Sequence, residues 1–206
     1  MNVAAIVVAG GRGERFGGLK QFEELNGRSL ASLSVERCRS VAQRVVLVVP
    51  QGYEGAGEGA DIVVVGGSSR SQSVRHGLAE CNDATFVLIH DAVRPSATRD
   101  LFRRVVDTLE AGAAAVIPGI PVVDTIKRVR NSVVIDTPDR SELIAVQTPQ
   151  GFVRELLVRA HESGLDATDD AGLVEALGER VIVVPGESSN LKVTEPSDLD
   201  RLRMDN

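Results

Sequence analysis

The chain is poor in aromatic residues and in cysteine. Phe, Tyr and Trp make up 3% of its 206 residues, tryptophan is absent, and there are two cysteines. Both of them, Cys38 and Cys81, fall on apolar helical faces, which favours buried free thiols over a disulfide or a metal site. The chain also lacks an apolar run near the roughly 20 residues that a membrane crossing needs. We therefore expect a cytoplasmic protein without a membrane partner.

An excess of basic residues is also missing. The 23 Lys and Arg against 29 Asp and Glu give a formal net charge of −6, which does not favour a nucleic-acid partner. Basic side chains gathered at one place on an acidic chain indicate a local anion site instead. The length suits one domain that covers residues 1–206.

Strand-sized apolar runs alternate with segments of helical spacing. Continuous apolar runs of this length are typical of strands covered on both faces, and they occupy residues 3–9, 45–49, 62–65, 86–89, 114–117 and 181–184. Helical spacing marks residues 74–78, 101–109, 152–160 and 173–177. The alternation predicts an α/β fold with a mostly parallel sheet flanked by helices. In such sheets the ligand lies beyond the carboxyl ends of the strands.

A glycine loop with basic residues follows the first apolar run. It contains Gly10, Gly11 and Gly13, and it carries Arg12, Arg15 and Lys20. Glycine allows backbone N–H groups to approach a phosphate closely, and nearby cations neutralise charge on a reacting phosphate. The loop therefore indicates a nucleotide site, although a plain turn would explain the glycines without the cations.

Two common phosphate loops do not fit this segment. A P-loop requires Lys and then Ser or Thr directly after its second glycine, whereas Gly18 is followed by Leu19, and Lys20 by Gln21. A dinucleotide fingerprint requires a third glycine where Phe16 stands.

Polar residues also follow other predicted strands. Asp91, after residues 86–89, suits Mg²⁺, which prefers oxygen ligands and substrate phosphates; a helix-entry turn is the alternative. The segment 66–73 offers N–H groups and hydroxyls to a base or phosphate, or a serine helix cap. Residues 168–170 read as a threonine cap followed by two acids that favour a helix start. Lys192 suits a phosphate, whereas Arg140 and residues 147–150 have no evident role from residue chemistry.

Residues 118–147 interrupt the alternation of strands and helices. Residues 124–129 and 132–136 alternate polar and apolar side chains around Arg130 and Asn131, which predicts an exposed β-hairpin. An isolated two-stranded hairpin is marginally stable in water. We therefore expect this segment to pack against something else, such as a second subunit.

In their order along the chain, these motifs resemble the 2-C-methyl-D-erythritol 4-phosphate cytidylyltransferases over about residues 3–200. The glycine loop is shared across sugar nucleotidyltransferases, whereas the combination of three other motifs is more specific to this family. They are His90-Asp91-Ala92-Val93-Arg94-Pro95, Asp124-Thr125-Ile126-Lys127 and Lys192-Val193-Thr194. The resemblance implies a Rossmann-like nucleotidyltransferase domain, transfer of CMP from CTP to methylerythritol phosphate, and Mg²⁺. It also implies a homodimer in which an arm at about residues 118–147 reaches the neighbouring subunit.

The resemblance also implies roles for individual residues. The predicted catalytic residues stabilise the transition state or position the substrate phosphate; they are Arg15, Lys20, Arg140 and Lys192. The predicted nucleotide-binding residues are Ala9, Gly10, Gly11, Gly13, Gly67, Arg70, Ser73, Asp91, Ala92 and Arg94, with Asp91 also the predicted metal ligand. Thr125 and Thr168 match positions near the polyol phosphate.

Three other functions share part of this pattern. Ribitol-5-phosphate cytidylyltransferases carry most of the same motifs and differ on the acceptor side. A catalytically silent nucleotide-binding regulator would have lost some of the cations, yet Arg15, Lys20 and Lys192 are all present. A molybdopterin guanylyltransferase-like enzyme shares the glycine loop but does not explain residues 124–127.

Overall fold

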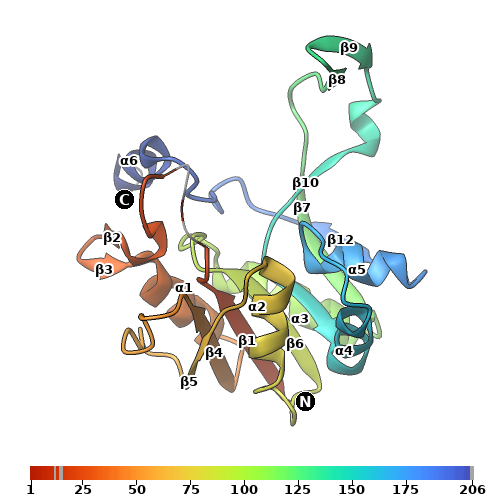
Figure 1. The fold of residues 1–206 in the computed structure, drawn as a ribbon. Coiled ribbons are helices and arrows are strands. Elements are labelled where there is room, and N and C mark those ends of the chain that lie inside the picture. Colours follow the sequence, from red (N-terminus) through yellow and green to blue (C-terminus); the bar gives the residue numbers. More distant parts are fainter. Residues whose placement is uncertain (12, 14–15, 205–206) are drawn as a thin grey trace.

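The computed structural model describes residues 1–11, 13 and 16–204, and its centre is one eight-stranded sheet (Figure 1). The strands are β1 (Val3–Val8), β4 (Arg44–Val49), β5 (Ile62–Val65), β6 (Phe86–Asp91), β7 (Ala115–Pro121), β10 (Ile144–Val146), β11 (Gln150–Val153) and β12 (Ile182–Pro185). They lie in the order β10-β7-β11-β6-β1-β4-β5, with β12 also paired to β7. Strands β1, β4, β5 and β6 pair in parallel, as do β7 and β12. The sheet is therefore mostly parallel, as the sequence predicts.

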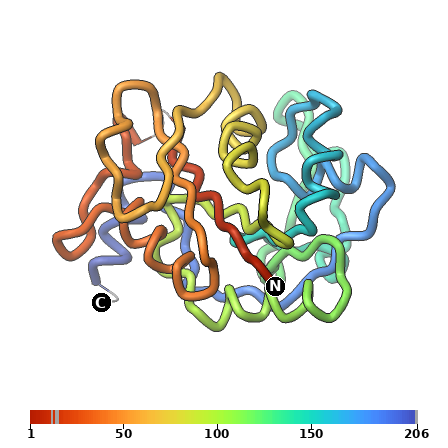
Figure 2. The backbone as a smooth tube through the Cα atoms, turned by 90° about the horizontal axis from the view of Figure 1, so that it is seen from below, coloured from red at the N-terminus to blue at the C-terminus, as the bar shows by residue number. Residues whose placement is uncertain are grey.

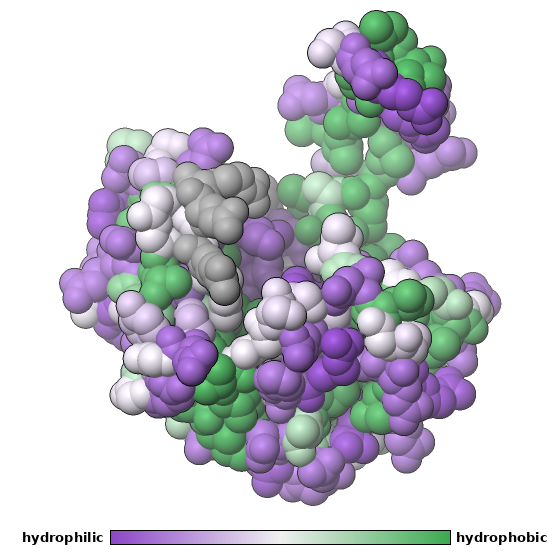
Figure 3. All heavy atoms as spheres, viewed as in Figure 1, coloured by the Kyte–Doolittle hydropathy of each residue, from purple (hydrophilic) through white to green (hydrophobic). Residues whose placement is uncertain are grey.

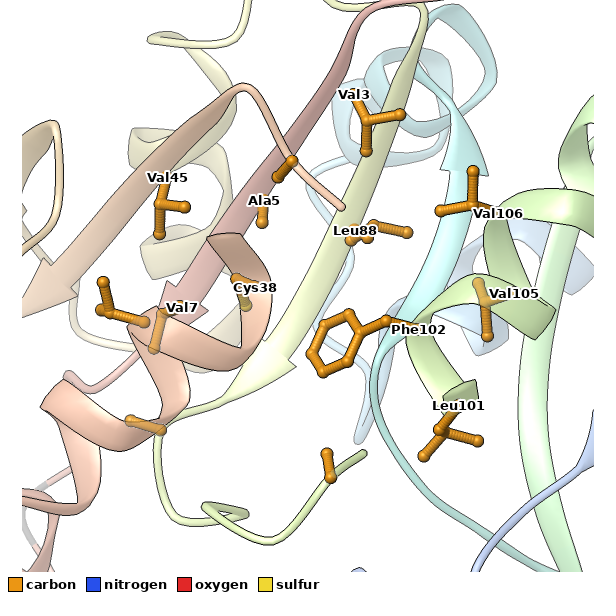
Figure 4. Close-up of a cluster of buried hydrophobic side chains, with 14 of the residues drawn as sticks. Val3, Ala5, Val7, Cys38, Val45, Leu88, Leu101, Phe102, Val105 and Val106 are labelled. Carbon is orange, nitrogen blue, oxygen red and sulfur yellow. The ribbon is translucent and has the colours of Figure 1, made fainter. Parts of the chain in front are cut away.

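Helices cover both faces of this sheet. Helices α1 (Leu30–Arg39) and α3 (Arg99–Glu110) pack on one face. Helices α2 (Arg70–Leu78), α4 (Arg154–Glu162) and α5 (Asp170–Ala176) pack on the other. Figure 2 shows α2 and α3 on opposite sides of β1. In Figure 4, Cys38 of α1 and Phe102 of α3 lie over the same face of the sheet as Val7. Because β1 contributes to both cores, its side chains are apolar on both faces.

Strand β11 is the main departure from the predicted pattern. The sequence predicts a helix from Phe152 onward, but Phe152 belongs to β11, and helix α4 begins at Arg154. Strand β11 runs antiparallel between β6 and β7. Its four residues are too few to show the alternation of polar and apolar side chains that marks a strand. Because three of them are apolar or glycine, the sequence does not separate them from the helix that follows.

The carboxyl ends of several strands meet at one edge of the sheet. The chain passes from β1 to β4 on one side, and later to β6 on the other side of β1. This reversal leaves a crevice at the carboxyl ends of β1 and β6, where ligands bind in open parallel sheets. The glycine loop follows β1 and Asp91 ends β6, so both lie at this crevice.

A small lobe lies beside the glycine loop. It consists of the short helix η1 (Lys20–Phe22), strands β2 (Glu24–Leu25) and β3 (Arg28–Ser29), and the C-terminal helix α6 (Pro196–Met204). Leu25, Leu199 and Leu202 share its apolar core with Val193. Segments from both ends of the chain thus pack together, as Figure 1 shows. Within the part of the chain described here, none of the helices has the length and apolar character needed to cross a membrane.

The predicted hairpin is present, and it stands away from the sheet as an arm (Figures 1 and 3). We call residues 121–146 the arm; it contains β8 (Arg128–Arg130), β9 (Val133–Asp136) and the short helix η2 (Arg140–Glu142), and it returns through β10. The turn lies at Asn131 and Ser132, whose φ angles are 49° and 62°. It is therefore one residue later than predicted, and the first strand is shorter because pairing begins at Arg128.

Candidate functional site

Two adjoining cavities lie at the carboxyl edge of the sheet. The larger, of about 480 Å³, is lined by Val8, Ala9, Gly10, Gly11, Gly13, Lys20, Gln21, Gly67, Ser68, Ser69, Arg70, Ser73, Asp91, Val93 and Lys192. The smaller, of about 300 Å³, is lined by Arg70, Asp91, Arg94, Val146, Gln147, Thr148, Gln150, Thr168, Asp169 and Lys192. They share one wall made of Arg70, Asp91 and Lys192.

Most of the predicted site residues meet at these cavities. The larger one gathers Ala9, Gly10, Gly11, Gly13, Lys20, Gly67, Arg70, Ser73, Asp91 and Lys192, and the smaller one adds Arg94 and Thr168. They come from segments that are far apart in the sequence and that the parallel sheet brings to one edge. The strand-end motifs of the sequence thus lie together at the carboxyl edge of the sheet.

The glycine loop is held by the buried side chain of Gln21. Its Nε2 donates to the carbonyl of Ala9 at 2.6 Å and to that of Gly11 at 3.0 Å. Gly13 has a φ of +64°, and a Cβ there would overlap the carbonyl oxygen of Gly18. Glycine is thus required at this point of the loop. Because Gln21 follows Lys20 directly, the same turn fixes the loop and carries a predicted catalytic cation.

The loop after β5 combines a helix cap with a cavity wall. Ser69 caps α2 by accepting from the N–H of Gln72 at 3.2 Å. The Ser73 hydroxyl accepts from the N–H of Gly67 at 3.0 Å and donates to the carbonyl of Ser69 at 2.9 Å. The serine cap is therefore confirmed, and the capped turn also lines the larger cavity.

Asp91 is the carboxylate of the shared wall. Its Oδ2 lies 2.8 Å from Nζ of Lys192 and 3.8 Å from Nε of Arg94. Burial on its own would raise the pKa of Asp91, but Lys192, Arg70 and Arg94 outweigh it and lower the pKa to about 2. Asp91 is consequently ionised at neutral pH, and three cations surround it at the wall that the two cavities share.

His90 has a structural role rather than a catalytic one. Its ring is fully buried, and burial lowers its pKa to about 4. The Thr148 hydroxyl accepts from the N–H of Asp91 at 3.1 Å and bonds to Nδ1 of His90 at 3.0 Å, and Nε2 of His90 bonds to the carbonyl of Arg94 at 3.2 Å. Neutral His90 thus fixes the backbone on which Asp91 and Arg94 stand.

The start of α5 forms a wall of the smaller cavity. The sequence predicts Thr168 as the helix cap, but the cap is Asp169, which accepts from the N–H of Gly172 at 3.1 Å. Thr168 lines the cavity instead. Asp169 also accepts from Nε2 of Gln150 at 2.8 Å. Which of the two neighbouring residues caps the helix depends on the residue at which the helix begins. The amino-acid sequence alone does not fix that starting point to within one residue.

Sequence reasoning gave no binding role to several residues that line the smaller cavity. They are Gln147, Thr148, Gln150 and Asp169. Gln147, Thr148 and Gln150 are each at most 6% exposed, and Gln147 and Asn190 bond with each other and tie this segment to residues 187–190. The available signal was a cluster of polar residues around Pro149 between two short apolar segments.

Three predicted residues that the structure describes are not brought to the cavities. Arg140 and Thr125 are exposed on the arm, where Nη1 of Arg140 donates to the carbonyl of Val123 at 2.6 Å. Ala92 is fully buried and lines neither cavity; its N–H donates to Val8 and its carbonyl accepts from Ser34. Arg15 lies outside the described residues.

The described residues include no group of three or more His, Cys, Asp or Glu side chains that could hold a metal ion. Mg²⁺ is usually bound through one or two carboxylates together with waters and substrate phosphates. A single ionised carboxylate, Asp91, beside the cavity that the glycine loop lines fits that pattern.

Comparison with known proteins gives a consistent result along the whole chain. A family model described as 2-C-methyl-D-erythritol 4-phosphate cytidylyltransferase matches residues 3–204. Proteins of that name from Rhodococcus jostii and Nocardia farcinica are 47% and 44% identical, each over 96% of this chain and over 92% and 91% of their own lengths. The crystal structure of the Thermus thermophilus protein of that name superposes with a TM-score of 0.85 at 34% identity, covering 99% of this chain and 98% of that one.

Proposed function

The chain belongs to the 2-C-methyl-D-erythritol 4-phosphate cytidylyltransferase family, and from this premise we propose how its residues divide the work. It is a cytidylyltransferase that transfers CMP from CTP to methylerythritol phosphate in isoprenoid biosynthesis. The observation that supports our assignment of residues is the shared wall. Two anionic substrates in adjoining cavities would meet at Arg70, Asp91 and Lys192.

We assign the larger cavity to CTP and the smaller one to the acceptor. The glycine loop lines the larger cavity together with Lys20, and glycine-rich loops after a strand bind phosphates through their N–H groups. The smaller cavity is lined mainly by hydroxyl, amide and charged side chains, which suit a polyol phosphate.

The reaction joins an acceptor phosphate oxygen to the α-phosphorus of CTP. That P–O bond forms while the bond from the α-phosphorus to the bridging oxygen breaks, and the electron pair leaves with pyrophosphate. Because the acceptor is already an anion, the step needs no strong general base. The main obstacle is repulsion between the two phosphates, so positioning and cationic side chains supply most of the catalysis.

Lys20 and Arg15 would stabilise charge on the triphosphate, and Lys192 would stabilise charge at the junction of the substrates. The contact of 2.8 Å between Lys192 and Asp91 holds this lysine at the shared wall before substrates bind. The buried guanidinium of Arg94, which donates to the carbonyl of Asn190 at 2.7 Å, fixes the adjacent wall of the acceptor cavity.

Asp91 would also hold Mg²⁺ together with triphosphate oxygens, and the ion would neutralise part of the phosphate charge. Asp91 therefore has two alternative partners, the lysine and the metal ion.

A homodimer would bring the two predicted residues of the arm to the site. The arm carries Arg140 and Thr125 together with exposed apolar side chains, among them Val129, Val133 and Val134, which are 53%, 66% and 54% exposed. Exposed apolar groups of this kind mark an interaction surface. We propose that the arm of one subunit packs on a second copy and supplies Arg140 to its acceptor cavity. A cytoplasmic location remains a prediction.

Pyrophosphate release tests the substrates directly. The purified protein is incubated with Mg²⁺, each of the four nucleoside triphosphates, and either methylerythritol phosphate or ribitol 5-phosphate. We expect release with CTP and methylerythritol phosphate alone. Faster release with ribitol phosphate would mean that the acceptor is ribitol phosphate and not methylerythritol phosphate. Release with GTP and not with CTP would mean that the nucleotide is assigned wrongly. CTP binding by calorimetry without release from any pair would indicate a silent regulator.

A further inference from the structure

The carboxylate of Asp170 is buried behind the shared wall and contacts two other side chains. It is the first residue of α5 and is 0% exposed. Its Oδ2 accepts from Nη1 of Arg70 at 2.7 Å, and its Oδ1 lies 3.0 Å from Nε2 of His161. The bond to Arg70 joins the start of α5, beside the acceptor cavity, to the start of α2, beside the nucleotide cavity.

Helix formation alone does not explain this carboxylate. The cap of α5 is the neighbouring Asp169, so Asp170 is not needed for that role. A buried charge is unfavourable unless it is paired and hydrogen-bonded, and a well-packed apolar residue is often as stable. An aspartate at residue 170 is therefore explained better by its effect on the side chain that it binds than by a gain in the stability of the fold.

That partner, Arg70, lines both cavities. A guanidinium has five N–H donors, and the bond to Asp170 uses one nitrogen, so donors remain for an anion in either cavity. Burial on its own would lower the pKa of Arg70, but Asp170, Asp91 and Asp169 outweigh it and raise the pKa. Arg70 is thus a fixed cation where the substrates meet.

His161 holds the other oxygen of the carboxylate. A carboxylate accepts, so Nε2 of His161 donates to it. The Nδ1 atom of His161 is buried and has no hydrogen-bond partner within the described part of the chain. A neutral ring with its proton on Nε2 suits both observations, because it leaves no buried N–H unpaired.

We propose that Asp170 is a positioning residue for the transfer reaction: it acts through Arg70, orienting the guanidinium at the wall shared by the two cavities, and His161 holds Asp170 in place. This proposal rests on the proposed function of the two cavities. In this proposal, Asp170 contacts neither CTP nor the acceptor.

A double-mutant cycle with Arg70→Gln and Asp170→Asn tests this. We expect Arg70→Gln to lower kcat/KM for CTP by about 100-fold, as for a lost electrostatic donor, and Asp170→Asn to lower it by about 10-fold through misplacement of Arg70. If Asp170 acts through Arg70, the double variant falls no further than Arg70→Gln alone. Independent effects would multiply to about 1,000-fold and would overturn the proposal.

A second readout separates this inference from the assignment of the acceptor. Calorimetric titration with CTP measures Kd for the same four proteins of the cycle. It needs no turnover and no acceptor, so the test remains valid even if the acceptor is assigned wrongly. Absence of wild-type CTP binding would reject the proposed function itself. If wild-type protein binds CTP but Asp170→Asn has kcat/KM and Kd within twofold of it, the positioning role is rejected.

Two further variants guard against a purely structural effect. If Asp170→Asn does not fold, His161→Gln takes its place in the cycle with Arg70→Gln. His161→Gln keeps the Arg70–Asp170 pair but removes the histidine that holds Asp170. The double variant should again fall no further than Arg70→Gln alone. Glu179→Gln is the matched control. It breaks the exposed pair between Glu179 and Arg159, whose charged atoms are 3.0 Å apart; Arg159 lies on α4, the helix that carries His161. It should leave both constants unchanged.

Discussion

The sheet edge and the arm carry two halves of the same predicted site, and they are built in opposite ways. At the sheet edge, Asp91 is 8% exposed and pairs with Lys192 inside the chain. On the arm, Val133 is 66% exposed, and Arg140 bonds to the neighbouring backbone of the arm itself. Asp91 is thus enclosed by this chain's own fold, whereas Val133 and Arg140 lie exposed on the arm.

This difference shows which part of the site depends on assembly. Asp91 and Arg70 at the sheet edge are mostly buried and lie among opposite charges of the same chain, so we expect substitutions there to act on chemistry within one subunit. The hairpin of β8 and β9 is paired only with itself in the described sheets, and such a hairpin is marginally stable alone. We expect substitutions on the arm to act through the second copy.

The largest expected effect is at the sheet edge. Lys20→Ala should lower turnover by about 10²–10³, because it removes a cation from the developing phosphate charge; Arg15→Ala should fall as far. Steady-state pyrophosphate release measures this, and thermal unfolding shows that the variants remain folded. Arg28→Ala, which breaks an exposed pair with Glu36, is the control. Near-normal turnover of Lys20→Ala would remove its assigned role.

The next effect concerns the arm as an interface. Val133→Asp places a charge among the exposed apolar residues of the hairpin, which would then be buried against a second copy. We expect the dimer to dissociate about 10–100-fold more readily, because burying an unpaired charge costs a few kcal/mol. Sedimentation across a concentration series measures this.

Met204→Asp is the control for this prediction, since Met204 is 78% exposed on α6, outside the arm. A wild-type protein that is monomeric at all concentrations, or a Val133→Asp variant that dimerises normally, would contradict the arm interface.

Much of this comparison was readable in the sequence. The parallel sheet and the strand-end position of Asp91 follow from apolar runs and topology rules, and the alternating polar and apolar residues predicted the hairpin. Strand β11, the cap at Asp169 and the contacts of Gln21 did not follow from it. Each depends on a long-range or one-residue detail, such as the carbonyls of Ala9 and Gly11 converging on one amide, that local pattern does not encode.

The smallest expected effect joins the two regions. Arg140→Ala should raise KM for methylerythritol phosphate by about 10-fold and leave CTP binding unchanged, because in the proposed dimer this guanidinium would bind the acceptor phosphate through a charge-assisted hydrogen bond. Kinetics with each substrate varied in turn measures this. Equal weakening toward both substrates would contradict a position on the acceptor side.

Mixing two inactive or weakened variants sharpens this last prediction. In a dimer of one Lys20→Ala subunit and one Arg140→Ala subunit, the site with intact Lys20 receives its arm from the subunit with intact Arg140. Random exchange makes half of the dimers mixed, and half of their sites are then intact, so about one quarter of all sites regain normal acceptor KM. If the arm served its own subunit, every site would lack one of the two cations and no such population would appear. The regained fraction therefore distinguishes an arm that completes a neighbour's site from one that serves its own subunit.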